Sequence, residues 1–119
     1  MNIEFESLTL PAPATVKIDF TLTTQVNVTD FTAQRKVSKL LLDQVGNLVY
    51  GEHPTLVAGK QLMWRVPVWV ALPTTGPLAQ IGVIDVNAQT GEVLATAELL
   101  YDLEERAHVV VERTTSATK

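Results

Sequence analysis

The sequence predicts an α+β fold, in which a mainly antiparallel β-sheet carries one or two packed helices. Apolar residues alternate with a period of two over several segments, and they recur at helical spacing over two others. A length of 119 residues suits one domain, and a hydrophobic content of 46% is ample for a packed core. We therefore expect a single domain that spans residues 1–119.

The N-terminal part of the chain predicts extended structure. A loose alternation over the first residues stops at Pro11 and Pro13, so residues 1–13 are expected to form an N-terminal arm or an edge strand. Residues 15–23 alternate strictly between apolar and polar side chains, which predicts a half-buried strand with one solvated face.

The next segment predicts an amphipathic helix of about four turns. Thr29 and Asp30 are both suitable N-caps, and Gly46 is expected in a left-handed conformation just past the last turn. The apolar residues that share one helical face are Ala33, Val37, Leu40, Leu41, Val45 and Leu48.

Further strands and a tight turn follow this helix. We expect strands at residues 55–58, 61–72 and 78–87, and a closing hairpin strand within 92–95. The turn 88–91 ends in a glycine, for which a positive φ is expected.

The chain returns to helical spacing from Thr96 onward. A run of three valines leaves residues 108–113 open between helix and strand, and residues 114–119 are expected to form a frayed polar tail. The apolar residues on one side of this last helix are Leu99, Leu100, Leu103, Ala107, Val110 and Val111.

The strand 61–72 is nearly free of charge and apolar on both faces. Trp64 and Trp69 have opposite parity in it, so they are expected on opposite faces of the sheet. Pro67 donates no ladder hydrogen bond, which predicts that the strand is an edge there or carries a bulge. An apolar edge strand needs cover, either from another chain or from the helices and N-terminal arm of the same chain. In the second case one tryptophan would lie under each helix.

These features predict an interface with another protein chain, most simply a second copy, so that the protein is at least a dimer at micromolar concentration. A soluble monomer rarely leaves an apolar patch of more than a few hundred Å² bare. The interface is expected on the strand 61–72 or on the apolar face of the last helix. The candidate residues are Trp64, Val66, Pro67, Val68, Trp69, Leu99, Leu103 and Val110.

No catalytic constellation is evident, so we expect a protein that is not an enzyme and uses no cofactor or metal. The chain has no cysteine and two histidines, and its basic residues are scattered, which disfavours nucleic-acid binding. It carries neither a signal-peptide pattern nor a membrane-spanning run, and we expect a cytoplasmic location. The alternative function is a small-molecule binder or enzyme with a pocket between helix and sheet near Tyr50, His53 and Trp64.

The segment 64–94 resembles a PepSY domain, in which a helix packs on an antiparallel sheet. Residues 64–68 correspond to the aromatic-bearing strand of that family, 82–86 to its glycine-containing strand, and 87–93 to its Thr-Gly-Glu-Val turn. With 33–49 as the helix of the family, the match covers about half of the chain; the strand before that helix and the long final helix are additional. The resemblance implies a partner-binding domain, with protease inhibition as a further alternative, and supplies no catalytic residue.

Overall fold

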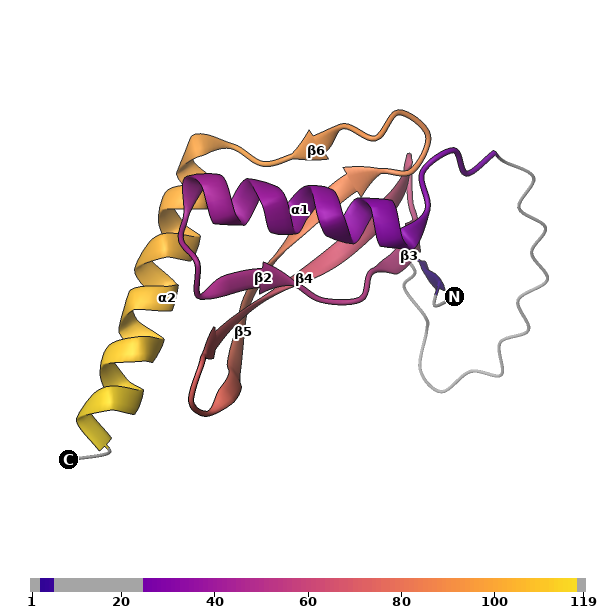
Figure 1. The fold of residues 1–119 in the computed structure, drawn as a ribbon. Helices are drawn as coiled ribbons and strands as arrows, with labels where there is room; N and C mark the ends of the chain where they lie inside the picture. Colours follow the sequence, from indigo (N-terminus) through magenta and orange to yellow (C-terminus); the bar gives the residue numbers. More distant parts are fainter. Residues whose placement is uncertain (1–2, 6–24, 118–119) are drawn as a thin grey trace, which may run out of the picture.

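The computed structural model describes residues 3–5 and 25–117, and the predicted strand 15–23 lies outside them. One sheet of mostly antiparallel strands and two helices make up these residues, which confirms the α+β class (Figure 1). In chain order the elements are β1 (Ile3–Phe5), α1 (Asp30–Gln44), β2 (Val49–Gly51), β3 (Thr55–Ala58), β4 (Leu62–Leu72), β5 (Gly76–Asn87), β6 (Val93–Leu94) and α2 (Ala97–Ala117).

Strand β4 lies at the centre of the sheet, so the prediction that it is an edge strand is wrong. On one side β4 pairs with β5, and on the other it pairs first with β3 and then with β2. Strand β1 extends the sheet by pairing in parallel with β3.

Pro67 has no backbone N–H to donate. It is tolerated in this central strand because it lies between the residues of β4 that pair with β3 and those that pair with β2. The pairing with β3 reaches Arg65 and that with β2 begins at Val68, so Pro67 belongs to neither ladder. Its carbonyl accepts a hydrogen bond from the backbone N–H of Glu52 at 2.8 Å. The register with β5 shifts between Val68 and Trp69, so the predicted irregularity begins one residue after the proline.

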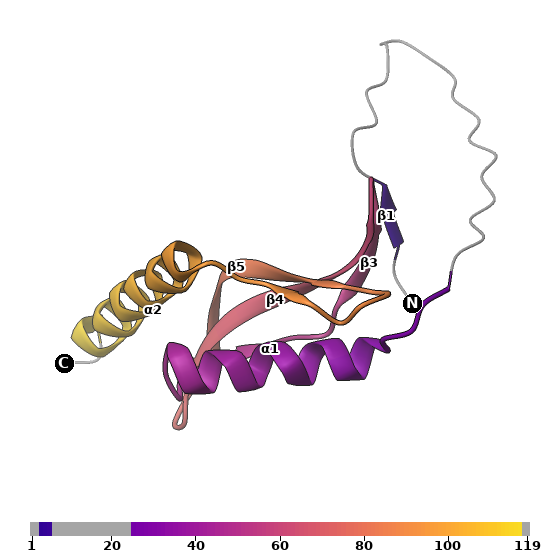
Figure 2. The same cartoon turned by 90° about the horizontal axis from the view of Figure 1, so that it is seen from above.

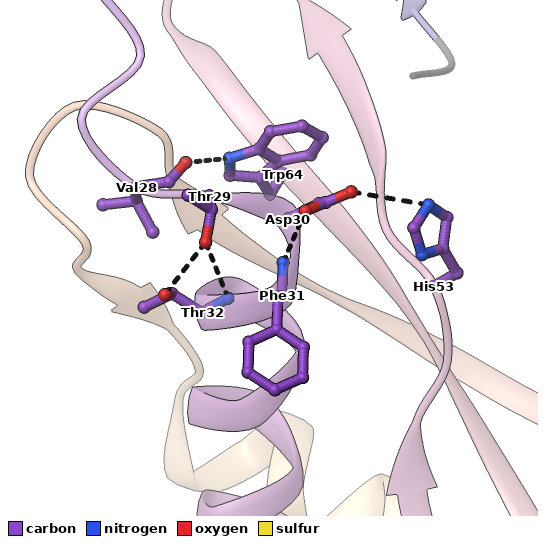
Figure 3. Close-up of polar contacts among 7 residues, drawn as sticks. All are labelled: Val28, Thr29, Asp30, Phe31, Thr32, His53 and Trp64. Carbon is purple, nitrogen blue, oxygen red and sulfur yellow. Dashed lines mark hydrogen bonds and ion pairs between the residues drawn. The ribbon is translucent and has the colours of Figure 1, made fainter.

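Helix α1 begins as predicted but ends differently. Thr29 is the N-cap, and its hydroxyl oxygen accepts a hydrogen bond from the backbone N–H of Thr32 at 3.1 Å (Figure 3). At the other end, the N–H groups of Val45 and Gly46 both donate to the carbonyl of Leu41. These two bonds close the helix without a left-handed residue, and the prediction of a positive φ at Gly46 is therefore wrong.

Helix α2 runs to Ala117, so residues 108–113 are helical and residues 114–117 of the predicted polar tail belong to the helix. The hydroxyl of Thr96 accepts from the N–H of Leu99 at its start. Near its end, the hydroxyls of Thr114 and Thr115 donate to the carbonyls four residues earlier, at 2.9 Å each. These bonds satisfy the polar groups of two threonines within the helix, which the composition of the tail does not reveal.

The predicted hairpin turn after β5 is confirmed. Gly91 has a φ of 80°, and β6 pairs with the end of β5. The side-chain oxygen of Asn87 accepts from the N–H groups of Gln89 and Thr90, so an asparagine-centred turn sets up the position that glycine occupies.

Both helices cover the same face of the sheet. Gly51 of β2 and Gly82 of β5 each pair with Val68, so the three residues form one row on one face. A Cβ atom at Gly51 would meet side chains of α1, and one at Gly82 would meet Leu103 of α2 at 2.7 Å. Since both contacts fall on this one face, the prediction of one tryptophan under each helix is wrong. Figure 2 shows α1 alongside the strands and α2 next to β5.

The core lies between this face and the two helices. Helix α1 contributes one buried stripe, and within residues 97–115 of α2 the fully buried side chain is Leu103. The strands contribute alternate residues of β4 and β5. Among the core residues are Ala33, Val37, Leu41, Trp64, Val66, Val68, Val70, Ile84 and Val86.

Candidate functional site

The face of the sheet opposite the helices carries the candidate site, and we call it the open face. Cross-strand pairing places Tyr50 beside Trp69, Val83 beside Pro67, and Asp85 beside Arg65 on this face. Val83 is 39% exposed and the other side chains are half-buried. The open face is defined as Tyr50, Met63, Arg65, Pro67, Trp69, Val83 and Asp85.

The predicted interface residues divide between the open face, the core and α2. Pro67 and Trp69 lie on the open face, and Leu99 and Val110 are half-buried on α2, where they pack against the core. The remaining four are fully covered by their own chain, so their assignment to an interface is corrected here. They are Trp64, Val66, Val68 and Leu103.

Trp64 is held in the interior by a polar contact as well as by packing. Its indole N–H donates to the carbonyl of Val28 at 2.6 Å, and the side chain is only 3% exposed (Figure 3). The segment that carries Val28 is itself fixed, because the N–H groups of Asn27 and Val28 donate to the carbonyl of Ala88. Trp64 is thus a structural residue with its donor satisfied.

An ion pair lies in the middle of the open face. Arg65 Nε is 3.0 Å from Asp85 Oδ1, and Arg65 Nη2 is 3.1 Å from Asp85 Oδ2, so the contact is bidentate. Because each charge already has its partner, another surface can cover this pair without leaving an isolated ion in a dry interface.

Tyr50 supplies a polar tip at the β2 end of the open face. Partial burial, the hydrogen bond with Glu52 and the negative charge of that carboxylate all raise the pKa of the Tyr50 hydroxyl. The phenol therefore stays neutral around pH 7, and it combines an apolar ring with a hydrogen-bonding group.

Side chains of α1 and α2 form hydrogen bonds with main-chain groups at the edges of the sheet. The N–H of Gly51 donates to Ser38 Oγ and its carbonyl accepts from Gln34 Nε2, both at 3.0 Å. On the β5 side, Arg106 Nη1 donates to the carbonyl of Ile81 at 2.8 Å. At these positions a further strand has no free group to pair with, which leaves the open face as the more accessible surface of the sheet.

The three residues of the alternative pocket do not converge. Tyr50 lies on the open face and Trp64 in the core on the opposite side of the sheet. His53 is exposed in the β2–β3 connection, with Nε2 3.6 Å from Asp30 Oδ2 (Figure 3). The prediction of a pocket formed by these residues is therefore wrong.

A shallow depression of about 260 Å³ does occur elsewhere, between the α1–β2 connection and α2. Most of its lining is apolar. The lining residues are Val45, Gly46, Asn47, Leu48, Val49, Glu104, Ala107, His108 and Val111.

Two further findings concern residues 3–5 and 25–117. Within these ranges no group of three or more histidine, aspartate or glutamate side chains is placed to hold a metal ion. Neither α1 nor α2 is both long and apolar enough to cross a bilayer.

Sequence reasoning missed five members of the open face. Met63 and Arg65 share the parity of Pro67 and Trp69 within one strand, and that signal was available in the sequence. Tyr50, Val83 and Asp85 join the face only through the register of β2 and β5 against β4, which local periodicity does not contain.

No family model matches the chain, and comparisons with curated proteins and with solved structures find no similar protein. The resemblance of residues 64–94 to PepSY domains thus stays a prediction from the sequence. The physical character of the open face therefore carries the functional proposal.

Proposed function

We propose that this chain is a non-enzymatic protein-binding module that associates with a second copy of itself through the open face. One observation carries the proposal. Both helices lie on one side of the sheet, and the other side presents apolar side chains around an ion pair that is already neutralised. Such a surface suits burial against a similar surface.

The chemistry of the open face favours self-association over a highly charged partner. Trp69 and Tyr50 are residue types that contribute strongly to binding energy when a partner desolvates them. Among the residues that define the open face, the charges of Arg65 and Asp85 balance each other, so these residues bring no net charge with which to attract an acidic or basic partner. A two-fold contact between identical faces is the simplest arrangement for such a patch.

The area of the open face indicates a weak dimer. Its members on β4 run from Met63 to Trp69, which is about 23 Å at roughly 3.3 Å per residue. Three strands about 4.8 Å apart add a width of roughly 14 Å, which gives about 320 Å² for each copy. The total of about 640 Å² is small for a stable protein interface, so we expect association in the micromolar range or weaker.

Three valines of equal exposure allow a matched test. Val83 on the open face is 39% exposed, Val26 before α1 is 40% exposed, and Val109 on α2 is 41% exposed. We expect Val83→Lys to raise the dissociation constant of the dimer at least about tenfold, since it places a charge in the apolar contact. Val26→Lys and Val109→Lys add the same charge elsewhere and should leave the constant unchanged.

Sedimentation equilibrium across micromolar concentrations measures these constants directly. A wild-type protein that stays at 13.0 kDa throughout would contradict the proposal. Equal weakening of the dimer by all three valine substitutions would also contradict the proposal. Such a result would reflect the change in net charge and not a contact at the open face.

A further inference from the structure

We infer a second contact between copies, in which the Phe31 side chain of one copy enters the depression beside α2 of another. This contact is separate from the open face and goes beyond the proposed function. It joins the start of α1 in one molecule to the surface between the α1–β2 connection and α2 in the next.

The size and lining of the depression indicate what it can hold. Pockets for drug-sized ligands or cofactors measure about 300–1,000 Å³. At about 260 Å³ and open to solvent, the depression beside α2 suits a single inserted side chain better. Val45, Leu48, Ala107 and Val111 provide apolar contact for such a side chain.

The border of the depression is acidic. Glu104 and His108 are exposed side chains that line it, and His108 Nε2 lies 3.1 Å from Glu112 Oε1 on the next turn of α2. The histidine thus already faces a carboxylate, and Glu104 supplies a further negative charge. A side chain that enters here is favoured if it brings a positive charge beside it.

Phe31 meets both requirements. It is 63% exposed in the first turn of α1, so the ring is accessible to another molecule. The guanidinium of Arg35, one turn later, lies 5.6 Å from the centre of the ring. The pair therefore presents an apolar anchor with an adjacent cation, which complements an apolar depression with Glu104 at its border.

The anchor and the depression belong to different molecules because they lie at opposite ends of α1. Phe31 is the second residue of the helix, whereas Val45 caps its last turn (Figure 1). At about 1.5 Å per residue, this places them roughly 20 Å apart. In the arrangement that we infer, each copy offers Phe31 to one neighbour and its depression to another, so association by this contact runs head to tail and grows with concentration.

A matched pair of alanine substitutions tests the anchor. Phe31 and Tyr101 are both 63% exposed aromatic residues on helices, and alanine is a better helix former than either. Sedimentation velocity over a concentration series measures the head-to-tail association, in the wild type and in the Val83→Lys variant. We expect Phe31→Ala to weaken it at least about tenfold and Tyr101→Ala to change it by less than about twofold.

A charge exchange tests the partner of Arg35. Arg35→Glu and Glu104→Arg should each weaken association severalfold, and an equimolar mixture of the two variants, or the double variant, should restore it. In Arg35→Glu the new carboxylate lies four residues before Lys39, and a Glu–Lys pair at this spacing stabilises a helix. Loss of the fold would therefore not explain weaker association of this variant. Restoration by the second substitution would identify a direct contact.

The results separate this contact from the open-face dimer. Association that stops at twice 13.0 kDa, is lost in Val83→Lys and is insensitive to Phe31→Ala would overturn the Phe31 contact and support the open face. Association that persists in Val83→Lys and is lost in Phe31→Ala would support the Phe31 contact and overturn the open face. If association is not restored when Arg35→Glu and Glu104→Arg are combined, the Phe31 contact is also overturned. A wild-type protein that stays monomeric would overturn both the Phe31 contact and the open-face dimer.

Discussion

Both faces of β4 are largely apolar, yet the two helices pack against only one of them. On one face, Trp64, Val66 and Val68 are at most 3% exposed, and α1 and α2 both pack against that face. On the other face, Pro67 and Trp69 are half-buried, and neither α1 nor α2 packs there. Apolar composition therefore does not decide which side chains stabilise the monomer. The placement of the helices decides it.

The largest expected effect separates the two tryptophans. Trp64→Ala should reduce the free energy of unfolding by about 3–5 kcal/mol, because it opens a cavity in the core and removes the partner of the Val28 carbonyl. Trp69→Ala should reduce it by only about 1–2 kcal/mol, in proportion to its partial burial. Denaturant unfolding of the monomeric protein measures both. Equal losses would mean that the open face is as well packed as the covered one.

The next effect concerns how closely α1 approaches the covered face. A methyl group at Gly51 would lie 2.8 Å from Val66 Cγ1 and 3.3 Å from Val37 Cγ1, so Gly51→Ala should cost about 1–3 kcal/mol by overpacking. Gly46→Ala is the control, since no atom lies within 4 Å of its added carbon. Chemical denaturation of both variants should give a loss only for Gly51→Ala. A neutral result there would show that α1 can shift away from the sheet.

A smaller effect is expected from the ion pair on the open face. Asp85→Asn should lower the free energy of unfolding of the monomer by about 0.5–1 kcal/mol, because both side chains are partly hydrated. It should weaken the dimer more strongly, since the guanidinium of Arg65 would lose the carboxylate of Asp85 in a contact that excludes water. Measuring stability and association on the same variant separates the two roles. If association stays unchanged, the pair lies outside the contact.

The smallest effect is a titration on the open face. Burial and Glu52 raise the pKa of Tyr50, so the folded state holds this proton more tightly than the unfolded state. The resulting stabilisation is complete below the unfolded pKa and is lost as the pH rises through the folded pKa. Glu52→Gln should move the pKa of Tyr50 downward in an ultraviolet absorbance titration. An unchanged titration would show that Glu52 does not act on the phenol.

Much of the local structure follows from the sequence because local interactions specify it. The strand at residues 55–58, the Thr29 cap of α1 and the positive φ of Gly91 all depend on neighbours within a few residues. Local rules failed where a distant or unusual partner intervenes. The carbonyl of Leu41 accepts the bonds that replace the left-handed cap expected at Gly46, and α2 continues to Ala117 with the hydroxyls of Thr114 and Thr115 bonded to carbonyls four residues earlier.

The candidate site was only partly predictable for the same reason. Parity within β4 already separates Trp64 from Trp69, so the sequence alone places the two tryptophans on opposite faces. The sequence does not indicate which of the two tryptophans is covered. That depends on which face of the sheet the two helices, far apart in the chain, pack against.

Periodicity in the sequence encodes the α+β class, most of the helices and strands, and the apolar character of both faces of β4. Strand register and long-range packing place both helices on one face, and they bring Tyr50, Val83 and Asp85 beside Trp69 on the other. The row formed by Gly51, Val68 and Gly82 shows the physical reason. Two positions without side chains, brought together by strand pairing, let two helices approach the same face closely, and this leaves the opposite face open.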